Sequence, residues 1–240
     1  MQNMIPPRSI GFLLFPRVTQ LDLTGPYEVF ARVPDAKVHL IWKTLDPVIS
    51  DRGLIMLPTA TFNNCPPLDL ICVPGGPGQI DLMEDDETLG FLRRLADEVQ
   101  WVTSVCTGSL VLGAAGLLQG YKATSHWSSL DQLSLLGAEP IQQRVVRDRN
   151  RITGAGVTSG IDFALTVVAD CYGREIAEAI QFQLEYDPSP PFACGSMAQV
   201  SADFLAAAKA RVSDLTRKRF AATERAAARL REPLFRDMQQ

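Results

Sequence analysis

The sequence has few histidines, no paired-cysteine motif and no long apolar run. Its two histidines, His39 and His126, lie far apart, so we expect no zinc site, and the sequence suggests no other metal or cofactor. The five cysteines are odd in number, widely spaced and free of any C-x-x-C pair, which argues against a disulfide framework. No stretch approaches the roughly 20 apolar residues that a membrane-spanning helix needs.

An excess of basic charge is also absent. The 240 residues include 23 Lys and Arg against 27 Asp and Glu, which gives a net charge of −4. Such a chain offers no positive surface to nucleic acid or to an anionic membrane. The apolar run Ile10–Phe15 is too short for the core of a signal peptide, so we expect a cytoplasmic protein.

What the chain does have is an alternation of short apolar runs with longer segments of helical spacing. The expected strands are Ile10–Phe15, Val38–Thr44, Asp69–Val73, Trp101–Val105, Tyr121–Thr124, Arg144–Asp148 and Ile152–Ala155. The expected helices are Pro26–Arg32, Glu87–Val99, Thr107–Leu118, Ser128–Leu136, Ser159–Cys171 and Glu175–Leu184. Short, continuously apolar strands favour a mostly parallel sheet, so the sequence predicts an α/β fold with helices on both faces of the sheet.

The length suits a single domain over residues 1–240, with a core at about 8–186 and a C-terminal helical segment at about 201–232. The segment Asp187–Pro191, with the sequence Asp-Pro-Ser-Pro-Pro, separates the two parts. Residues Ala202–Leu230 are rich in Ala and Arg and have helical spacing. We expect this helix to pack on the domain or on a second subunit; the alternative is a helix that binds another protein.

Cys106 is the candidate nucleophile. It follows the expected strand Trp101–Val105 and precedes a helix, at the sheet edge where ligands gather in open α/β folds. Its neighbours two positions away, Ser104 and Gly108, are small, as a strained strand-to-helix elbow requires. Because a helix start favours an anion, we expect a lowered thiol pKa and a reactive thiolate. An inert, buried role is expected for the other four cysteines, Cys65, Cys72, Cys171 and Cys194.

A glycine-rich run, Val73–Gly78, ends the preceding strand. Glycines let backbone N–H groups approach a ligand closely. Donors from Gly76 and from Thr107, the residue after the nucleophile, would stabilise a developing negative charge, and Gly75 belongs to the same substrate-binding loop. The alternative is an ordinary glycine-rich turn.

Asp22 is the candidate acid–base residue, between the first strand and its helix. A carboxyl group that lies beside a thiolate and is shielded from water has a raised pKa, so it exchanges protons near neutral pH. The alternative is an N-cap or turn carboxylate. Glu28 is the competing carboxylate, or else a residue that supports the site, although its place within a helix also suits a side chain that faces solvent.

His126 offers a different chemistry, because a Cys–His pair is typical of hydrolases. No acidic third member is evident beyond Asp131. The alternative is a hydrogen-bonded histidine at the start of the following helix, in which case it only supports the site.

Six ordered motifs resemble those of the ThiJ/PfpI superfamily over residues 8–186. They are Leu21–Phe30, Val73–Gly76, Val105–Gly108, Ala115–Leu118, Ala123–Trp127 and Thr153–Asp162. The resemblance implies a flavodoxin-like three-layer sandwich, related to class I glutamine amidotransferases, and a homodimer. It is greatest with the superfamily's isonitrile-hydrating enzymes, which form N-substituted formamides without a metal. This implies Cys106 as nucleophile in a covalent thioimidate mechanism, Asp22 as acid–base partner, and isonitrile and water as substrates.

Other members of the superfamily match less well. Its proteases carry Cys-His at the elbow, whereas this chain has Thr107 after the cysteine. Its glyoxalase-like members usually place a glutamate where this chain has Asp22. Its AraC-type regulators add helix-turn-helix motifs, for which we expect too little chain after Asp187. A thiol-based stress sensor and a hydrolase that uses His126 as base stay open as alternatives.

Overall fold

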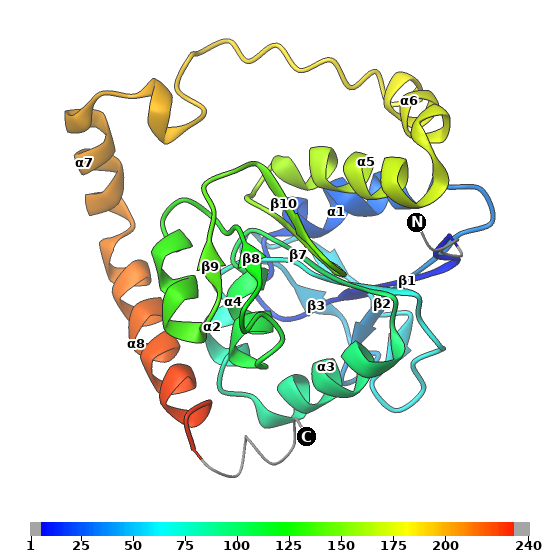
Figure 1. Ribbon diagram of the computed structural model, residues 1–240, viewed down its shortest axis with the longest axis horizontal. Coiled ribbons are helices and arrows are strands. Elements are labelled where there is room, and N and C mark those ends of the chain that lie inside the picture. Colours follow the sequence, from blue (N-terminus) through cyan, green and yellow to red (C-terminus); the bar gives the residue numbers. More distant parts are fainter. Residues whose placement is uncertain (1–5, 233–240) are drawn as a thin grey trace.

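The architecture of the protein, described here for residues 6–232 of a computed structural model, is built on a seven-stranded sheet (Figure 1). The strand order is β10-β11-β7-β6-β1-β2-β5. The strands are β1 (Ser9–Leu13), β2 (Lys37–Trp42), β5 (Ala60–Thr61), β6 (Leu70–Val73), β7 (Trp101–Val105), β10 (Val145–Asp148) and β11 (Arg151–Gly154). All neighbouring strands are parallel except the β10–β11 pair.

The central strands are buried along their whole length, because helices cover both faces of the sheet. Every residue of β6, β7 and β11 is buried. Figure 1 shows α1 (Gln20–Phe30), α5 (Ser159–Tyr172) and α6 (Arg174–Gln183) on one side, and α2 (Gln79–Leu82), α3 (Asp86–Glu98) and α4 (Gly108–Ala114) on the other. The predicted α/β arrangement with a mostly parallel sheet is therefore confirmed.

The predicted start of α1 is wrong. The helix begins at Gln20, six residues before the predicted Pro26, and Pro26 lies inside it. Proline has no N–H to donate to the carbonyl four residues earlier, which here belongs to Asp22. Asp22 consequently lies in the first turn of a helix and not in the loop that precedes it.

Several short elements also differ from the predictions. The predicted helix Ser128–Leu136 is a 3-10 helix, η1 (Leu130–Leu136), which ends at Gly137 in a left-handed conformation. The predicted strand Tyr121–Thr124 is shorter in the structure, where β8 contains only Lys122–Ala123. It pairs with β9 (Glu139–Pro140) in a separate two-stranded sheet. The hairpin of β3 (Val48–Ile49) and β4 (Ile55–Met56) was not predicted.

The C-terminal segment forms two helices where one was expected. They are α7 (Ala202–Arg211) and α8 (Ser213–Arg229), and the 3-10 turn η2 (Met197–Gln199) precedes them. In Figure 1 a long connection leads from α6 to α7, and α8 runs along the side of the domain. Helix α8 packs against α2, α4 and η1. Among residues 6–232, no helix has the length and apolar character to cross a membrane.

Candidate active site

The candidate site residues converge because the strands that precede them are neighbours in the sheet. Strands β1, β6, β7 and β11 lie side by side and run parallel. Their carboxyl ends therefore meet at one edge of the sheet, where open α/β folds bind ligands. Asp22 follows β1, Gly75 follows β6, Cys106 follows β7 and Gly156 follows β11.

Cys106 occupies the elbow between β7 and α4 in a strained conformation. Its φ is 58°, a region that residues with a side chain rarely adopt. Its N–H donates to the Gly154 carbonyl at 2.9 Å. Its own carbonyl accepts from Ser109 Oγ at 3.2 Å and from Ser125 Oγ at 3.1 Å. The elbow predicted from Ser-x-Cys-x-Gly is confirmed, and the surrounding hydrogen bonds hold it in place.

Two glycines let the backbone pack directly against the nucleophile. A Cβ on Gly156 would lie 2.6 Å from Cys106 Cβ and 2.9 Å from its sulfur. A Cβ on Gly75 would lie 2.8 Å from Cys106 Cβ. Both distances are far inside van der Waals contact, so no side chain fits at either position without moving the cysteine.

Asp22 is fully buried beside the thiol. Within the described chain neither of its carboxyl oxygens has a partner at full hydrogen-bonding geometry. The pKa of Asp22 is raised to about 7, mainly by burial and in part by the charge of Asp51, although contacts with the Cys106 thiol and the Gly75 backbone oppose the rise. A carboxyl group in this state exchanges protons near neutral pH, as predicted.

The expected low pKa of the Cys106 thiol is wrong. Burial and the charge of Asp22 together raise the pKa of Cys106 well above its ordinary value, although the Thr107 backbone N–H and the Arg219 charge oppose this. The helix start alone cannot outweigh desolvation of a thiolate that is only 5% exposed. Just above pH 7, Asp22 and Cys106 therefore hold one proton between them.

The expected oxyanion donors differ in their availability. The Gly76 N–H donates to Thr107 Oγ1 at 3.1 Å, so it is already hydrogen-bonded and is not free to bind an oxyanion. The Thr107 N–H faces the Cys106 sulfur, where it lowers the thiol pKa. Thr107 thus remains the better placed of the two candidate donors.

Comparison with known proteins identifies the family of this chain. The sequence pattern of the DJ-1/PfpI family matches residues 8–170. The chain belongs to the DJ-1/PfpI family. It is 56% identical over 222 residues to an isonitrile hydratase of Pseudomonas putida, an alignment that spans 92% of this chain and 97% of the relative. It is 34% identical to the HTH-type transcriptional regulator GbdR of Pseudomonas aeruginosa, over 75% of this chain and 51% of the regulator.

Solved structures agree with this assignment. A ThiJ/PfpI family protein from Pseudomonas syringae superposes with a TM-score of 0.88 at 48% identity, and the match covers 91% of each chain. Drosophila melanogaster DJ-1beta matches with a TM-score of 0.67 at 22% identity, over 76% of this chain and 98% of that one. The second likeness concerns the fold alone. The superfamily resemblance drawn from the six motifs is confirmed.

In this DJ-1/PfpI protein, Glu28 is not part of the site. Its side chain is exposed and pairs with Arg32 at 2.5 Å, one helical turn further along α1. The helical spacing of α1 explains the difference, because residues six apart in a helix point in different directions, so Asp22 is buried while Glu28 is exposed. Glu28 is therefore excluded as a supporting residue.

His126 is buried enough to stay neutral. Burial and the nearby Arg219 charge lower the pKa of His126 to about 4. Its Nδ1 lies 2.8 Å from Ser128 Oγ, in the same loop. Among residues 6–232, no hydrogen bond or ion pair joins His126 to Cys106, so the structure brings the histidine near the site without pairing it to the nucleophile.

Arg219 was missed by the sequence analysis. It is 5% exposed on α8, and its Nη1 donates to Ser129 Oγ at 3.0 Å. The signal was present in the sequence, because Leu215, Arg219 and Ala222 share one helical stripe. Only the tertiary structure shows that α8 packs on α4 and on η1, beside the elbow's loop.

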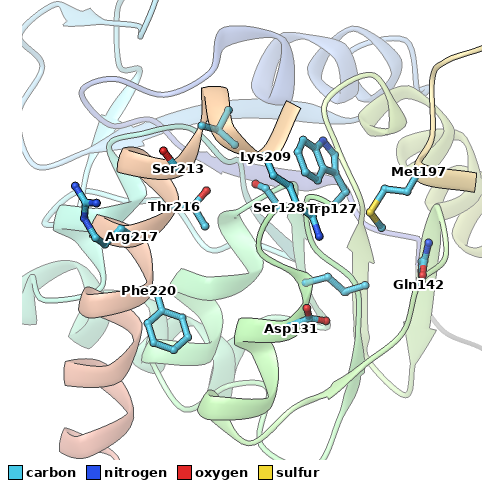
Figure 2. A pocket seen from close by; sticks show the side chains of 12 residues that line it. Trp127, Ser128, Asp131, Gln142, Met197, Lys209, Ser213, Thr216, Arg217 and Phe220 are labelled. Atoms are coloured by element: carbon cyan, nitrogen blue, oxygen red, sulfur yellow. The ribbon is translucent and has the colours of Figure 1, made fainter. Parts of the chain in front are cut away.

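A separate cavity of about 690 Å³ lies between helix α8 and the loop that contains Trp127 and Ser128 (Figure 2). Trp127, Ser128 and Asp131 line it from the loop and η1, while Thr216 and Phe220 line it from α8. Neither Cys106 nor Asp22 is among its lining residues.

Within residues 6–232, no cluster of three His, Cys, Asp or Glu side chains is arranged to hold a metal ion.

Proposed function

We propose that this protein hydrates isonitriles to N-substituted formamides through a covalent thioimidate on Cys106. The observation that carries the proposal is the buried Cys106–Asp22 pair at the β7 elbow, in which Asp22 titrates near pH 7. The 56% identity to an isonitrile hydratase over nearly the whole chain supports the same conclusion.

The first step forms the covalent intermediate. The pair reacts from the form in which Cys106 is a thiolate and Asp22 is protonated. The sulfur bonds to the terminal carbon of R–N≡C, and the Asp22 proton moves to that carbon. The product is the neutral thioimidate Cys106–S–CH=N–R, with Asp22 left as a carboxylate.

The second step consumes water. Asp22 takes one proton from water as the oxygen bonds to the thioimidate carbon, and passes this proton to the nitrogen. Asp22 then accepts the hydroxyl proton while the C–S bond breaks. The products are R–NH–CHO, the Cys106 thiolate and protonated Asp22, so the site returns to its starting state.

The site suits this substrate in two respects. An isonitrile has no amine to expel, so one carboxyl group can perform every proton transfer and no histidine is required. Its linear N≡C end is narrow, which fits a nucleophile that is only 5% exposed. The Thr107 N–H near the sulfur would stabilise negative charge there.

Two alternatives fit the geometry less well. Oxidant-sensing thiols are accessible and have low pKa values, whereas Cys106 is buried with a raised pKa. A Cys–His hydrolase needs a histidine that takes up a proton near neutral pH, whereas the pKa of His126 is about 4.

A homodimer and a cytoplasmic location are part of the proposal. The dimer rests on the superfamily resemblance. The location is in keeping with five free cysteines, of which only Cys194 is exposed, since disulfides are rare in reducing compartments.

The proposal is tested by following the infrared isonitrile stretch with an aromatic and a cyclohexyl isonitrile, while formamide is detected separately. We expect turnover by the wild type, none by Cys106→Ala, and a loss of about 10²–10⁴-fold in Asp22→Asn. Glu28→Gln is the matched control, since this carboxylate is exposed, and should stay within twofold. Substantial turnover by Cys106→Ala would remove covalent catalysis; no turnover by the wild type would reject the substrate class.

A further inference from the structure

Arg219 occupies an unexpected position on the inner face of α8. The buried residues of this helix are Arg219, Ala222, Thr223, Ala226 and Ala227. All except Arg219 are small and uncharged. Burying a guanidinium group without an anionic partner opposes folding, so an apolar residue would be expected here if packing alone decided the position.

The guanidinium group of Arg219 is only partly satisfied by its neighbours. Its Nη1 donates to Ser129 Oγ, but its buried Nε has no hydrogen-bond partner among residues 6–232. No Asp or Glu of the described chain forms an ion pair with it. Burial lowers the pKa of Arg219, and the charge of Cys106 acts in the opposite direction.

The loop between β8 and η1 connects Arg219 to the nucleophile. Ser129 Oγ accepts from Arg219 at 3.0 Å at one end of this loop. Ser125 Oγ donates to the Cys106 carbonyl at 3.1 Å at the other end. Helix α8 also packs on α4, whose first residue, Gly108, comes two positions after Cys106. The guanidinium group is thus fixed relative to the elbow by packing and by hydrogen bonds.

We propose that Arg219 is a positioning residue that delivers a fixed positive charge to the active site and stabilises the Cys106 thiolate. The C-terminal helix would then be part of the catalytic machinery as well as of the fold. This role refines the proposed function, but it concerns the thiol itself and can be measured without an isonitrile.

The charges around the sulfur come from two helices. The charge of Asp22 on α1 raises the pKa of Cys106, and the charge of Arg219 on α8 lowers it. Asp51 acts on Asp22, and His126 is neutral beside Arg219. With one proton on the Cys106–Asp22 pair, the pair carries one negative charge and Arg219 balances it.

The charge of Arg219 also affects which of the two groups, Cys106 or Asp22, carries that proton. This charge lowers the pKa of Cys106, against the effects of burial and of Asp22. A cation that acts on the sulfur favours the thiolate with protonated Asp22 over the thiol with ionised Asp22. The thiolate form is the one from which the first step starts.

The test compares Arg219→Met with Arg219→Lys in the full chain. Alkylation of Cys106 by iodoacetamide is followed from pH 6 to 10.5 on the Cys106 peptide by mass spectrometry. For Arg219→Met we expect the titration midpoint to rise by about one pH unit. The rate at pH 7 should fall about three- to fourfold, because a more basic thiolate recovers part of the loss as nucleophilicity. Arg219→Lys keeps the charge and should resemble the wild type.

Thermal stability distinguishes the proposed electrostatic role of Arg219 from a purely structural one. Replacing a buried charge by an apolar side chain of similar length is often neutral or stabilising, so Arg219→Met should keep the wild-type melting temperature or exceed it. Arg225→Met is the matched control on the same helix, because Arg225 is half exposed and pairs with Glu84. It should leave the alkylation profile unchanged.

The results that overturn the proposal are specific. A folded Arg219→Met with the wild-type alkylation profile would reject it. If Arg219→Met does not fold, an Arg219→Lys profile shifted upward by one unit or more would reject it instead. Failure of isonitrile turnover in the wild type, with the Arg219 shift present, would reject only the proposed function.

Discussion

At the scale of single residues, the site is governed by one proton shared between two acids. Burial raises the pKa of Asp22 to about 7 and that of Cys106 well above its ordinary value. The pair therefore holds two protons below pH 7, one proton above it, and none only at high pH. The apparent pKa values belong to the pair, since the two groups interact strongly.

This proton count predicts the pH dependence of activity. Only the singly protonated pair supplies both a thiolate and an acid, so kcat/KM should rise as pH increases through about 7 and fall again at high pH. The measurement is kcat/KM for an isonitrile between pH 5.5 and 10. His126→Gln should keep the same lower midpoint, because the pKa of His126 is about 4. A midpoint that moves in this variant, or a rate that falls through pH 7, would contradict the shared-proton account.

At the scale of secondary-structure elements, the elbow depends on glycine at Gly156. This residue has a φ of 113°, and a Cβ there would lie 2.6 Å from Cys106 Cβ. We expect Gly156→Ala to lower stability by roughly 1–3 kcal/mol, from backbone strain and overpacking. It should also reduce activity sharply, because the relief of the clash displaces the sulfur.

A variant at a second glycine distinguishes the effect of backbone strain from that of the clash with Cys106. Gly173 has a φ of 98°, but a Cβ there would meet no atom within 4 Å. Gly173→Ala should therefore lower the melting temperature through strain alone and leave turnover at the wild-type level. Equal activity losses in the two variants would show that close packing on Cys106 is not what requires the glycine.

Some secondary-structure elements could be predicted from the sequence and others could not. Strand β6 was predictable because it is a continuous apolar run and β7 because it is rich in β-branched and aromatic residues, and the elbow was predictable from the small residues on both sides of Cys106. Strands β3 and β4 contain two residues each, too few for any period to appear. The start of α1 was missed because Pro26 is typical of a first turn but lies in the middle here.

Arg219 and the thiol pKa were missed for a different reason. Both depend on which elements pack together across the sheet, and local periodicity does not contain that information. A helical stripe shows that Arg219 shares a face with Ala222, but not that α8 packs on α2, α4 and η1. Likewise, a helix start predicts a lowered pKa for Cys106, whereas burial on all sides reverses the direction.

At the scale of the whole molecule, the two C-terminal helices differ in how firmly they belong to the domain, and the single-domain prediction for residues 1–240 depends on this difference. Helix α7 has no buried residue. Helix α8 buries five residues, and its Thr223 Oγ1 donates to Gln132 Oε1 of η1 at 2.8 Å. Its Arg225 also forms a bidentate pair with Glu84, at 2.6 and 2.7 Å.

Hydrogen exchange measured by mass spectrometry should show this division. We expect peptides of α8 to exchange as slowly as those of β7, because opening α8 exposes its packed face, while α7 exchanges quickly. Thr223→Val should reduce the protection of α8 by about 1–3 kcal/mol, since it leaves Gln132 without its donor. Thr216→Val is the matched control, because the buried Thr216 hydroxyl has no hydrogen-bond partner in the described chain, and it should leave protection unchanged or raise it. If α8 exchanged as fast as α7, the C-terminal segment would be a loosely attached appendage, and it could not hold the Arg219 charge fixed beside the nucleophile.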